Sequence, residues 1–158
     1  MSRTVGTIRN EVLYSLSPHD RVVLAVSGGM DSMVLLDAAR GAAPELIVAT
    51  FDHGTGPAAT DAARLVRRRS AELGLRCFAG KASVKATSEA LWREQRWKFL
   101  RTIARDNAAV IATAHTLDDQ VETVFIRILR DAGPRGLAGL YARTDVLRPL
   151  LGTHRAEV

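Results

Sequence analysis

Ser27-Gly28-Gly29-Met30-Asp31-Ser32 is the segment that indicates the fold class most clearly. It directly follows a continuous apolar run at residues 22–26, which is typical of a strand buried on both faces. It opens a helical pattern over residues 32–40 that stops at Gly41. The two glycines let backbone N–H groups approach an anion, and the N-terminus of the next helix favours negative charge at the same place. We therefore expect residues 27–32 to bind phosphate, with the hydroxyls of Ser27 and Ser32 as further donors.

The loop contains no lysine, so it is not the nucleotide loop that ends in Gly-Lys-Ser/Thr. For two glycines alone, a tight strand-to-helix turn with a serine N-cap would be the simpler interpretation. The full six residues in this context favour an anion site instead. Asp31 would repel a phosphate unless a cation bridges the two groups, and Mg²⁺ is the natural cation. The sequence thus predicts a magnesium ion placed by Asp31.

Short apolar runs alternate with longer helical patterns along the chain. Further strands are expected at residues 46–51, 75–79, 109–114 and near 146–147, and further helices at residues 4–16, 60–73, 88–106 and 117–130. Ser88 is the expected N-cap of the helix at residues 88–106. The alternation requires crossover connections, so the predicted fold class is α/β, an open parallel sheet of about five strands with helices on both faces. Ligands bind beyond the carboxyl ends of such strands, where residues 27–32 would lie.

The length of 158 residues suits one domain, residues 1–158, with its own core. Apolar residues make up 47% and charged residues 25%, which is ordinary for a soluble globular protein. No apolar run approaches the roughly 20 residues that span a bilayer, and no secretory signal is visible, so we expect a cytoplasmic protein with no membrane partner. The single cysteine, Cys77, excludes an intramolecular disulfide and a Cys-x-x-Cys site. A net charge of +5 is compatible with phosphate-rich partners, although Arg67-Arg68-Arg69 is better interpreted as a solvated helix face.

A polar cluster follows the strand expected at residues 109–114. His115 comes directly after that strand, and Asp118, Asp119 and Glu122 fall within an arc of about 100° on the helix expected next. Three carboxylates on one face repel each other unless they hold a cation, such as a metal ion or an ammonium group. Alternatively, acidic residues in a first helical turn simply complement the helix dipole, and a strand-end histidine needs no catalytic role. An apolar stripe runs beside the carboxylates at Leu117, Val121, Val124 and Ile128.

Arg93 and Arg96 lie one turn apart on the helix expected at residues 88–106 and share a face. Two fixed cations there would neutralise a triphosphate or stabilise a departing pyrophosphate. The equally simple alternative is a solvated helix face with Trp92 and Phe99 in the core. The glycine-dense residues 130–140 are expected to form a shaped loop, which either carries part of the site or is a plain connector.

The hexapeptide SGGMDS resembles the SGGxDS signature of the PP-loop, or N-type, ATP pyrophosphatases. Members of that family split ATP between its α- and β-phosphates and adenylate an oxygen of their substrate. The remaining motifs resemble, in the same order, those of the tRNA(Ile)-lysidine synthase family in its N-terminal catalytic domain. They are His53-Gly54, Arg93-Glu94-Gln95-Arg96-Trp97, residues 115–123, the glycine loop and Arg148-Pro149-Leu150-Leu151. The resemblance implies an adenine nucleotide alpha hydrolase-like, PP-loop fold.

The chain departs from that family's pattern at several positions. Thr55-Gly56 stands where the family has Leu-Arg, and Thr116 stands where it has a second histidine, so any role of those family side chains is lost here. Trp97 replaces Tyr, Asp131 replaces Gly and Leu140 replaces Met. The family's C-terminal tRNA-binding domain is not part of these 158 residues. Residues 153–158 would form an N-cap and the first turn of a helix, so we expect the chain to be truncated at this end.

The resemblance implies that ATP, with Mg²⁺, adenylates the C2 oxygen of the wobble cytidine in the anticodon loop of an isoleucine tRNA. The amine of free L-lysine then attacks C2 and expels AMP. By the same resemblance, Ser27 to Ser32 hold the ATP phosphates, and Arg93 and Arg96 attend the phosphates or the tRNA backbone. Asp119 and Glu122 would hold the lysine ammonium or the metal, with His115 near the reacting centre.

Two alternatives stay open, namely another PP-loop tRNA-modifying adenylating enzyme and an inactive truncated nucleotide-binding module. Cys77 alone does not fit the thiolation enzymes of this fold, which need a cysteine pair or a catalytic cysteine. We expect the chain to bind ATP but to bind tRNA weakly and with a strong salt dependence. The sequence favours no particular oligomeric state.

Overall fold

The computed structural model describes residues 5–82, 88–129 and 145–158. Every strand and helix expected from the sequence is present, and no end is shifted by more than three residues. The glycine-dense residues 130–140 lie outside the described residues. In chain order the elements are α1 (Val5–Leu16), β1 (Arg21–Ala25), α2 (Met30–Ala38), β2 (Glu45–Asp52), α3 (Pro57–Glu72), β3 (Arg76–Lys81), α4 (Glu89–Asp106), β4 (Val110–Thr113), α5 (Leu117–Leu129), β5 (Val146–Leu147) and the 3₁₀ turn η1 (Arg155–Glu157).

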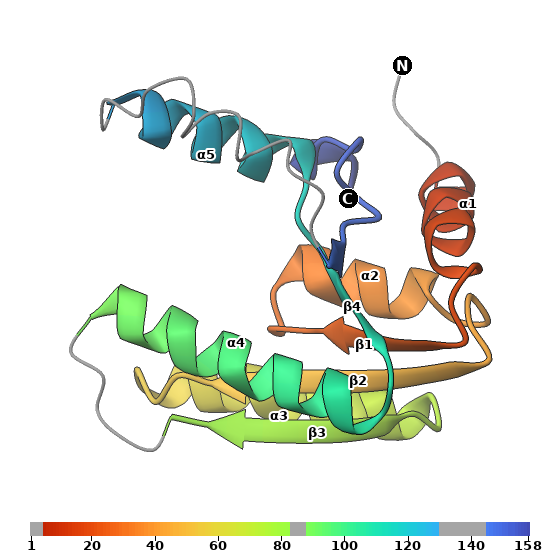
Figure 1. Ribbon diagram of the computed structural model, residues 1–158, viewed down its shortest axis with the longest axis horizontal. Coiled ribbons are helices and arrows are strands. Elements are labelled where there is room, and N and C mark those ends of the chain that lie inside the picture. The colour runs from red at the N-terminus through yellow and green to blue at the C-terminus, as the bar shows by residue number, and fades with distance from the viewer. Residues whose placement is uncertain (1–4, 83–87, 130–144) are drawn as a thin grey trace.

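The five strands form one parallel sheet in the order β3-β2-β1-β4-β5, which confirms the predicted fold class (Figure 1). The central strand β1 pairs with β2 on one side and with β4 on the other, so that Val23 lies beside both Ile47 and Ile111. The chain moves outward from β1 through β2 to β3, and then returns to the opposite side of β1. This reversal makes the carboxyl ends of β1 and β4 the topological switch point, where open α/β sheets bind their ligands.

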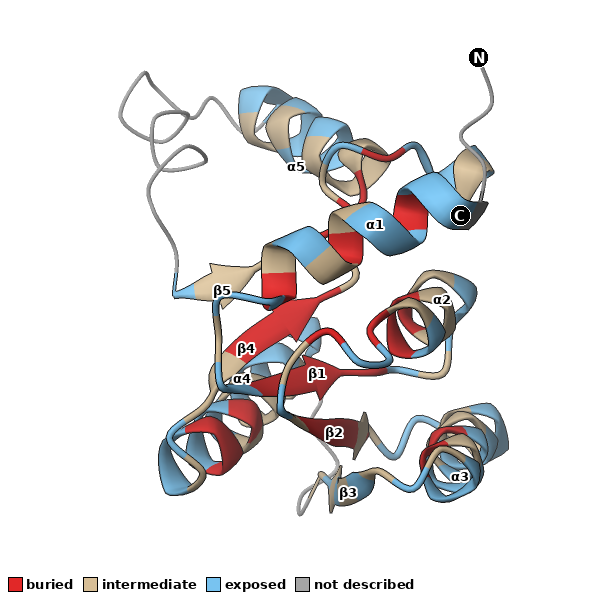
Figure 2. Ribbon diagram, turned by 90° about the vertical axis from the view of Figure 1, so that its right-hand side faces the viewer, coloured by how far each residue is buried: buried red, intermediate tan, exposed pale blue. Residues whose placement is uncertain are grey.

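Alternate residues of the central strand β1 pack into two hydrophobic cores on opposite faces of the sheet (Figure 2). Val22 and Leu24 pack with helices α1, α2 and α3, whereas Val23 and Ala25 pack with α4. All of these strand side chains are nearly or fully buried, as expected of a parallel sheet covered on both faces. Ser88 caps α4 as predicted, because its hydroxyl accepts a hydrogen bond from the Leu91 N–H at 3.4 Å.

Helix α5 differs from the other helices because none of its residues is buried. The apolar stripe that the sequence predicts on it is largely exposed, with Val121 60% and Ile128 54% accessible. Figure 1 shows α5 extending away from the sheet and its covering helices. Its first turn is held in place by the Leu117 N–H, which donates to the Thr153 carbonyl at 2.9 Å. No helix in the described parts of the chain is long and apolar enough to cross a bilayer.

The end of the chain differs in detail from the expected helical first turn at residues 153–158. The turn there is the 3₁₀ segment η1, and His154 rather than Thr153 occupies its N-cap position. The Glu157 carboxylate accepts a hydrogen bond from the His154 N–H at 3.2 Å, which fixes the start of the turn one residue later. Thr153 is instead buried, and its hydroxyl donates to Glu11 of α1 at 3.2 Å. The segment is thereby tied to the body of the domain.

Candidate active site

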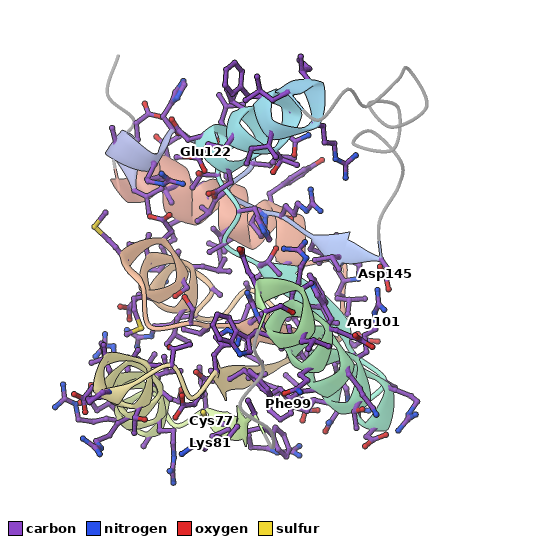
Figure 3. All side chains as sticks on the ribbon, turned by 90° about the vertical axis from the view of Figure 1, so that its left-hand side faces the viewer. Cys77, Lys81, Phe99, Arg101, Glu122 and Asp145 are labelled. Atoms are coloured by element: carbon purple, nitrogen blue, oxygen red, sulfur yellow. The ribbon has the colours of Figure 1, made fainter. Side chains whose placement is uncertain are left out.

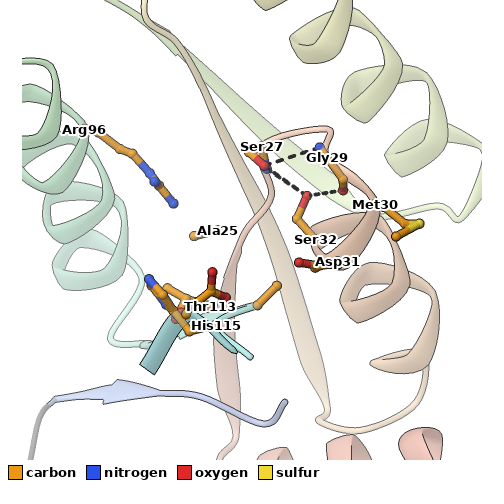
Figure 4. A pocket seen from close by; sticks show the side chains of 11 residues that line it. Ala25, Ser27, Gly29, Met30, Asp31, Ser32, Arg96, Thr113 and His115 are labelled. Carbon is orange, nitrogen blue, oxygen red and sulfur yellow. Dashed lines mark hydrogen bonds between the residues drawn. The ribbon is translucent and has the colours of Figure 1, made fainter. Parts of the chain in front are cut away.

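A pocket of about 230 Å³ lies at the switch point between the carboxyl ends of β1 and β4 (Figure 4). Its walls come from the loop after β1, the end of β4, the start of α5 and one side chain of α4. Among the residues singled out in the sequence, it gathers Ser27, Gly29, Met30, Asp31, Ser32, Arg96, His115 and Asp119. Residues far apart in the chain therefore meet where the sequence predicted the site.

The loop at residues 27–32 is held by its own side chains. The Ser32 hydroxyl donates to the Gly29 carbonyl at 2.8 Å, and the Ser27 N–H donates to the Ser32 hydroxyl oxygen at 3.2 Å. The Gly29 N–H donates to the Ser27 hydroxyl oxygen at 3.3 Å. Both serines were expected to donate to phosphate. In this structure their hydroxyls form hydrogen bonds within the loop and hold its conformation. The anion site consists of the loop and the N-terminus of α2, whose first N–H groups have no partner within the helix.

Gly28 does not line the pocket but allows the loop to turn. Its φ is +89°, a left-handed conformation that only glycine adopts readily. A Cβ at this position would lie 2.8 Å from the carbonyl oxygen of Ala62 on α3. The loop therefore packs directly against α3, and any larger residue at position 28 would push the two apart.

Asp31 faces the pocket from the first turn of α2, and its side chain is 23% exposed. Burial raises the pKa of its carboxyl above the usual value, and the nearby charges of Asp119 and Asp118 raise it further. The guanidinium of Arg155 opposes these effects. A carboxylate in this position is stabilised by a neighbouring cation, which agrees with the reason for expecting one from the sequence.

Arg155 of η1 is that cation in this structure. Its guanidinium lies 2.6 Å from Asp119, 3.5 Å from Glu122 and 3.7 Å from Asp31. The backbone N–H of Arg155 also donates to the Asp118 carboxylate at 2.6 Å. The acidic residues that the sequence predicts on one face of α5 therefore do surround a positive charge. That charge is Arg155 of the same chain. The pairing of Arg155 with Asp119 was not predictable from the sequence, because the two residues are 36 positions apart and no local spacing links them.

Thr116 has a structural role that the sequence analysis overlooked. Its N–H and its hydroxyl both donate to the Asp119 carboxylate, at 2.8 and 2.9 Å. In the opposite direction, the Asp119 N–H donates to the Thr116 hydroxyl oxygen at 3.5 Å. This is a capping box at the start of α5. The pattern Thr-x-x-Asp in the sequence is its usual signature and would have revealed it. Burial alone would raise the pKa of Asp119, but the hydrogen bonds from Thr116 and Arg155 outweigh it and hold that pKa below the usual value.

His115 follows β4 and lines the pocket with its imidazole. Its Nδ1 lies 2.7 Å from the hydroxyl of Thr113, so one ring nitrogen is already engaged. Burial, followed by the positive charge of Arg148, lowers the pKa of His115 below the usual 6.5. The imidazole is therefore neutral at pH 7 and able to accept a proton.

Arg93 and Arg96 lie on the same helix but line different cavities. Arg96 points from α4 across the pocket toward the loop (Figure 4), and it also lines an adjoining cavity of about 190 Å³. That second cavity has largely apolar walls, including Phe51 and the half-buried ring of His53. Arg93 lies outside both, in a groove on the outer side of α4. The structure thus separates the two arginines into different surroundings.

The family comparison agrees with this geometry. The model of the PP-loop domain family matches residues 2–158. The chain belongs to the PP-loop domain family.

Three curated relatives that carry the name tRNA(Ile)-lysidine synthase align with most of this chain. The protein of Thermosipho africanus is 35% identical over 156 residues, covering 90% of this chain and 36% of its own length. That of Thermus thermophilus is 39% identical, with 94% and 31% covered, and that of Methylobacterium nodulans is 43% identical, with 87% and 44% covered. The chain thus spans between about a third and somewhat under half of the length of these relatives.

Two solved structures of proteins with low sequence identity share the fold. The U34-tRNA thiolase NcsA from Methanococcus maripaludis superposes with a TM-score of 0.76 at 20% identity, covering 97% of this chain and 61% of that one. NMN synthetase from Francisella tularensis superposes with a TM-score of 0.70 at 12% identity, covering 98% and 68%. At such identities the likeness concerns the fold alone.

Proposed function

We propose that residues 1–158 are the ATP-dependent catalytic domain of a tRNA(Ile)-lysidine synthase. The observation that carries the proposal is the pocket at the switch point of the sheet. There the glycine loop, the desolvated carboxylate of Asp31 and the neutral imidazole of His115 meet in one cavity. The relatives that align with 87–94% of this chain carry that name. With tRNA and free lysine as substrates, the activity would take place in the cytoplasm.

ATP would occupy two neighbouring cavities, with its phosphates in one and its base and ribose in the other. The N–H groups at the start of α2 and the loop around Gly29 offer donors and a positive dipole end to the phosphates. The adjoining apolar cavity beside Phe51 and His53 suits the flat base and ribose. Arg96 lines both cavities, so its guanidinium would lie beside the phosphate chain.

The first step is adenylation of the RNA. The C2 oxygen of the cytidine attacks the α-phosphorus, the bond from that phosphorus to the bridging oxygen breaks, and pyrophosphate leaves with the bonding electrons. Negative charge grows on the departing pyrophosphate. The fixed charge of Arg96 and the N-terminus of α2 would stabilise it, since preorganised donors of this kind act most strongly on developing charge.

Asp31 would place a Mg²⁺ ion at this site together with ATP. The described residues contain no group of three or more histidine, cysteine or acidic side chains arranged to hold a metal ion alone. This arrangement fits Mg²⁺, which commonly takes one or two carboxylates and completes its shell with phosphate oxygens and water. The raised pKa of Asp31 also fits, because a nearby cation would relieve the cost of its buried charge. The ion would supply charge neutralisation between the phosphates.

The second step joins lysine to the base. The lysine amine adds to C2 and loses a proton, and the bond from C2 to the adenylated oxygen breaks with AMP as the leaving group. His115 is neutral and within the pocket, so its imidazole would accept that proton. Asp119 and Glu122 would hold a lysine ammonium in the position that the guanidinium of Arg155 now occupies.

The single cysteine argues against a sulfur-transfer reaction on the same fold. Cys77 lies in β3, away from the residues that line the pocket. Burial raises the pKa of its thiol, so it has little of the thiolate character that a catalytic cysteine needs. A lysine-dependent ligation is therefore favoured over thiolation, although the fold serves both.

Turnover in vitro tests the proposal. The chain is incubated with ATP, Mg²⁺ and a transcript of isoleucine tRNA that carries a wobble cytidine, and AMP and pyrophosphate are quantified with and without lysine. The proposal predicts pyrophosphate release that requires the RNA and AMP release that requires lysine. ATP binding without RNA-dependent turnover would instead support an inactive nucleotide-binding module.

A further inference from the structure

A groove of about 1000 Å³ lies on the outer side of α4, much larger than the two cavities at the phosphate loop. The residues of α4 and β5 line it. Figure 3 looks onto this face of the molecule, with Arg101 of α4 and Asp145 at the start of β5 labelled on the same side of the helix. Phe99 lies on the other side of α4, toward β3. The groove is thus distinct from the pocket of the glycine loop.

Positive charge dominates the groove. Two carboxylates, Glu94 and Asp145, face five cationic side chains. The cations are Arg93, Lys98, Arg101, Arg105 and Arg148. Arg105 is partly neutralised by Asp106, 3.0 Å away. The remaining excess matches a polyanion, because a concave surface of one sign concentrates ligands of the other.

Three of the five cations and Trp97 follow one row of the helix. Arg93, Trp97, Arg101 and Arg105 are spaced four residues apart, so they lie along one side of α4. At 1.5 Å per residue the row is about 18 Å long. A linear arrangement of this length matches the phosphates of an extended strand better than a single small anion.

Trp97 adds an aromatic surface to the row. Its ring is half-buried, and the guanidinium of Arg101 lies 5.7 Å from the ring centroid. Aromatic rings and arginine planes are the groups on which unpaired bases stack, and with a basic groove they form the usual site for single-stranded RNA. An acidic peptide would need the cations but not the ring.

One residue that lines the groove, Arg148, lies close enough to the reaction pocket for its charge to act on His115. Ala112 of β4 pairs with Leu147 of β5, so Arg148 follows its strand at the same sheet edge where His115 follows β4. The Nε of Arg148 is buried and has no hydrogen-bond partner in the described part of the chain, as expected of a donor that meets an anion. Besides burial, the charges of Arg148 and, more weakly, Arg96 and Arg93 lower the pKa of His115, in agreement with this proximity.

We propose that the groove along α4 holds the single-stranded RNA next to the modified nucleotide, with Arg101 and Arg105 on its phosphates and Trp97 beneath a base. The assignment rests on the proposed function, in that the base entering the pocket belongs to this strand.

Charge reversal in the groove tests the assignment. The probe is a fluorescent RNA hairpin with the isoleucine anticodon loop, titrated at low and at physiological salt with the full chain. Arg101→Glu/Arg105→Glu should weaken binding at low salt about tenfold or more. It should also make the slope of log K against log salt shallower by about 1 to 2, since each lost phosphate contact on a single strand removes about 0.7. Arg101→Lys/Arg105→Lys should restore most of the binding.

Arg67→Glu/Arg68→Glu on α3 is the matched control, because it changes the net charge equally on an exposed face that does not line the groove. It should weaken binding less than twofold, and both variants should keep the melting temperature. Equal loss in both double variants, loss in neither, or no binding by the unaltered chain at low salt would each overturn the assignment. RNA binding that depends on the groove, without lysine-dependent AMP release, would refute the proposed function. The assignment of the groove as an RNA-binding site would still hold.

Discussion

The guanidinium of Arg155 lies 2.6 Å from a carboxylate oxygen of Asp119, although 36 residues separate them in the chain. Hydrogen bonding to Asp119 is the largest reason that the pKa of Arg155 is raised, so the guanidinium stays charged. The same guanidinium contacts Glu122 and Asp31, which links η1, α5 and the phosphate loop. The position where the proposed reaction would hold an ammonium group is thus already filled by an internal cation.

Replacing Arg155 should improve the use of lysine. In Arg155→Ala the carboxylates of Asp119 and Glu122 lose their neighbouring cation, so an incoming ammonium no longer competes with it. We expect the KM for lysine in the tRNA-dependent reaction to fall severalfold. Arg155→Lys retains a charge at this position and should stay close to the unaltered chain. A KM that rises in Arg155→Ala would show that the guanidinium positions the carboxylates for the substrate instead.

Asp31→Ala should abolish pyrophosphate release without unfolding the protein. The carboxylate is desolvated and its pKa is raised, so folding disfavours its charged form relative to the unfolded chain. Removing it should therefore leave the melting temperature unchanged or slightly higher. RNA-dependent pyrophosphate release should fall by roughly 100-fold or more, the scale for losing one group that acts on transition-state charge.

Asp37→Ala is the control for that substitution, because Asp37 is exposed at the other end of the same helix, where it pairs with Arg69. It should retain pyrophosphate release. Comparable activity in Asp31→Ala and Asp37→Ala, or unfolding of Asp31→Ala alone, would exclude a metal-placing role for Asp31.

Gly28→Ala should be far more destabilising than Gly29→Ala. An alanine at position 28 would adopt a left-handed conformation and bring its Cβ to 2.8 Å from the Ala62 carbonyl oxygen. We expect a loss of about 2–5 kcal/mol in the free energy of unfolding from strain and overpacking together. Gly29 has φ −75°, and a Cβ there meets only the Ser27 hydroxyl oxygen at 3.5 Å, so its change should stay within about 1 kcal/mol. Urea denaturation of both variants measures the difference, and equal losses would be inconsistent with the loop packing on α3.

Much of this fold follows from local patterns in the sequence. The continuous apolar runs at β1, β2 and β4 indicated strands buried on both faces, and the glycine loop after β1 indicated the sheet edge that carries the pocket. Contacts across the sheet were not predictable in this way. The meeting of Arg155 with Asp119 and the separation of Arg93 from Arg96 depend on how the final segment and α4 lie in space. The capping box at Thr116 was predictable, since its signature is local.

His115 should titrate below the usual histidine pKa of 6.5. Between that lowered pKa and 6.5 the unfolded chain binds more protons than the folded one, so the free energy of unfolding should rise with pH across this window. NMR titration of the imidazole measures the pKa directly. Arg148→Gln should move it upward, because it removes the largest charge effect on the ring. A pKa at or above 6.5 in the unaltered chain would contradict the role of a neutral proton acceptor.

Transfer of labelled lysine to RNA would show directly whether the chain ligates lysine to the wobble cytidine. The chain, ATP, Mg²⁺ and isotopically labelled lysine are incubated at low salt with the isoleucine tRNA transcript, and the digested RNA is analysed by mass spectrometry. We expect one lysine on the wobble cytidine, formed with an equal amount of AMP and absent in Asp31→Ala. A transcript with uridine at the wobble position should receive none. Turnover of ATP with no lysine on the RNA, or lysine found equally on the uridine transcript, would contradict the proposed ligation of lysine to the wobble cytidine.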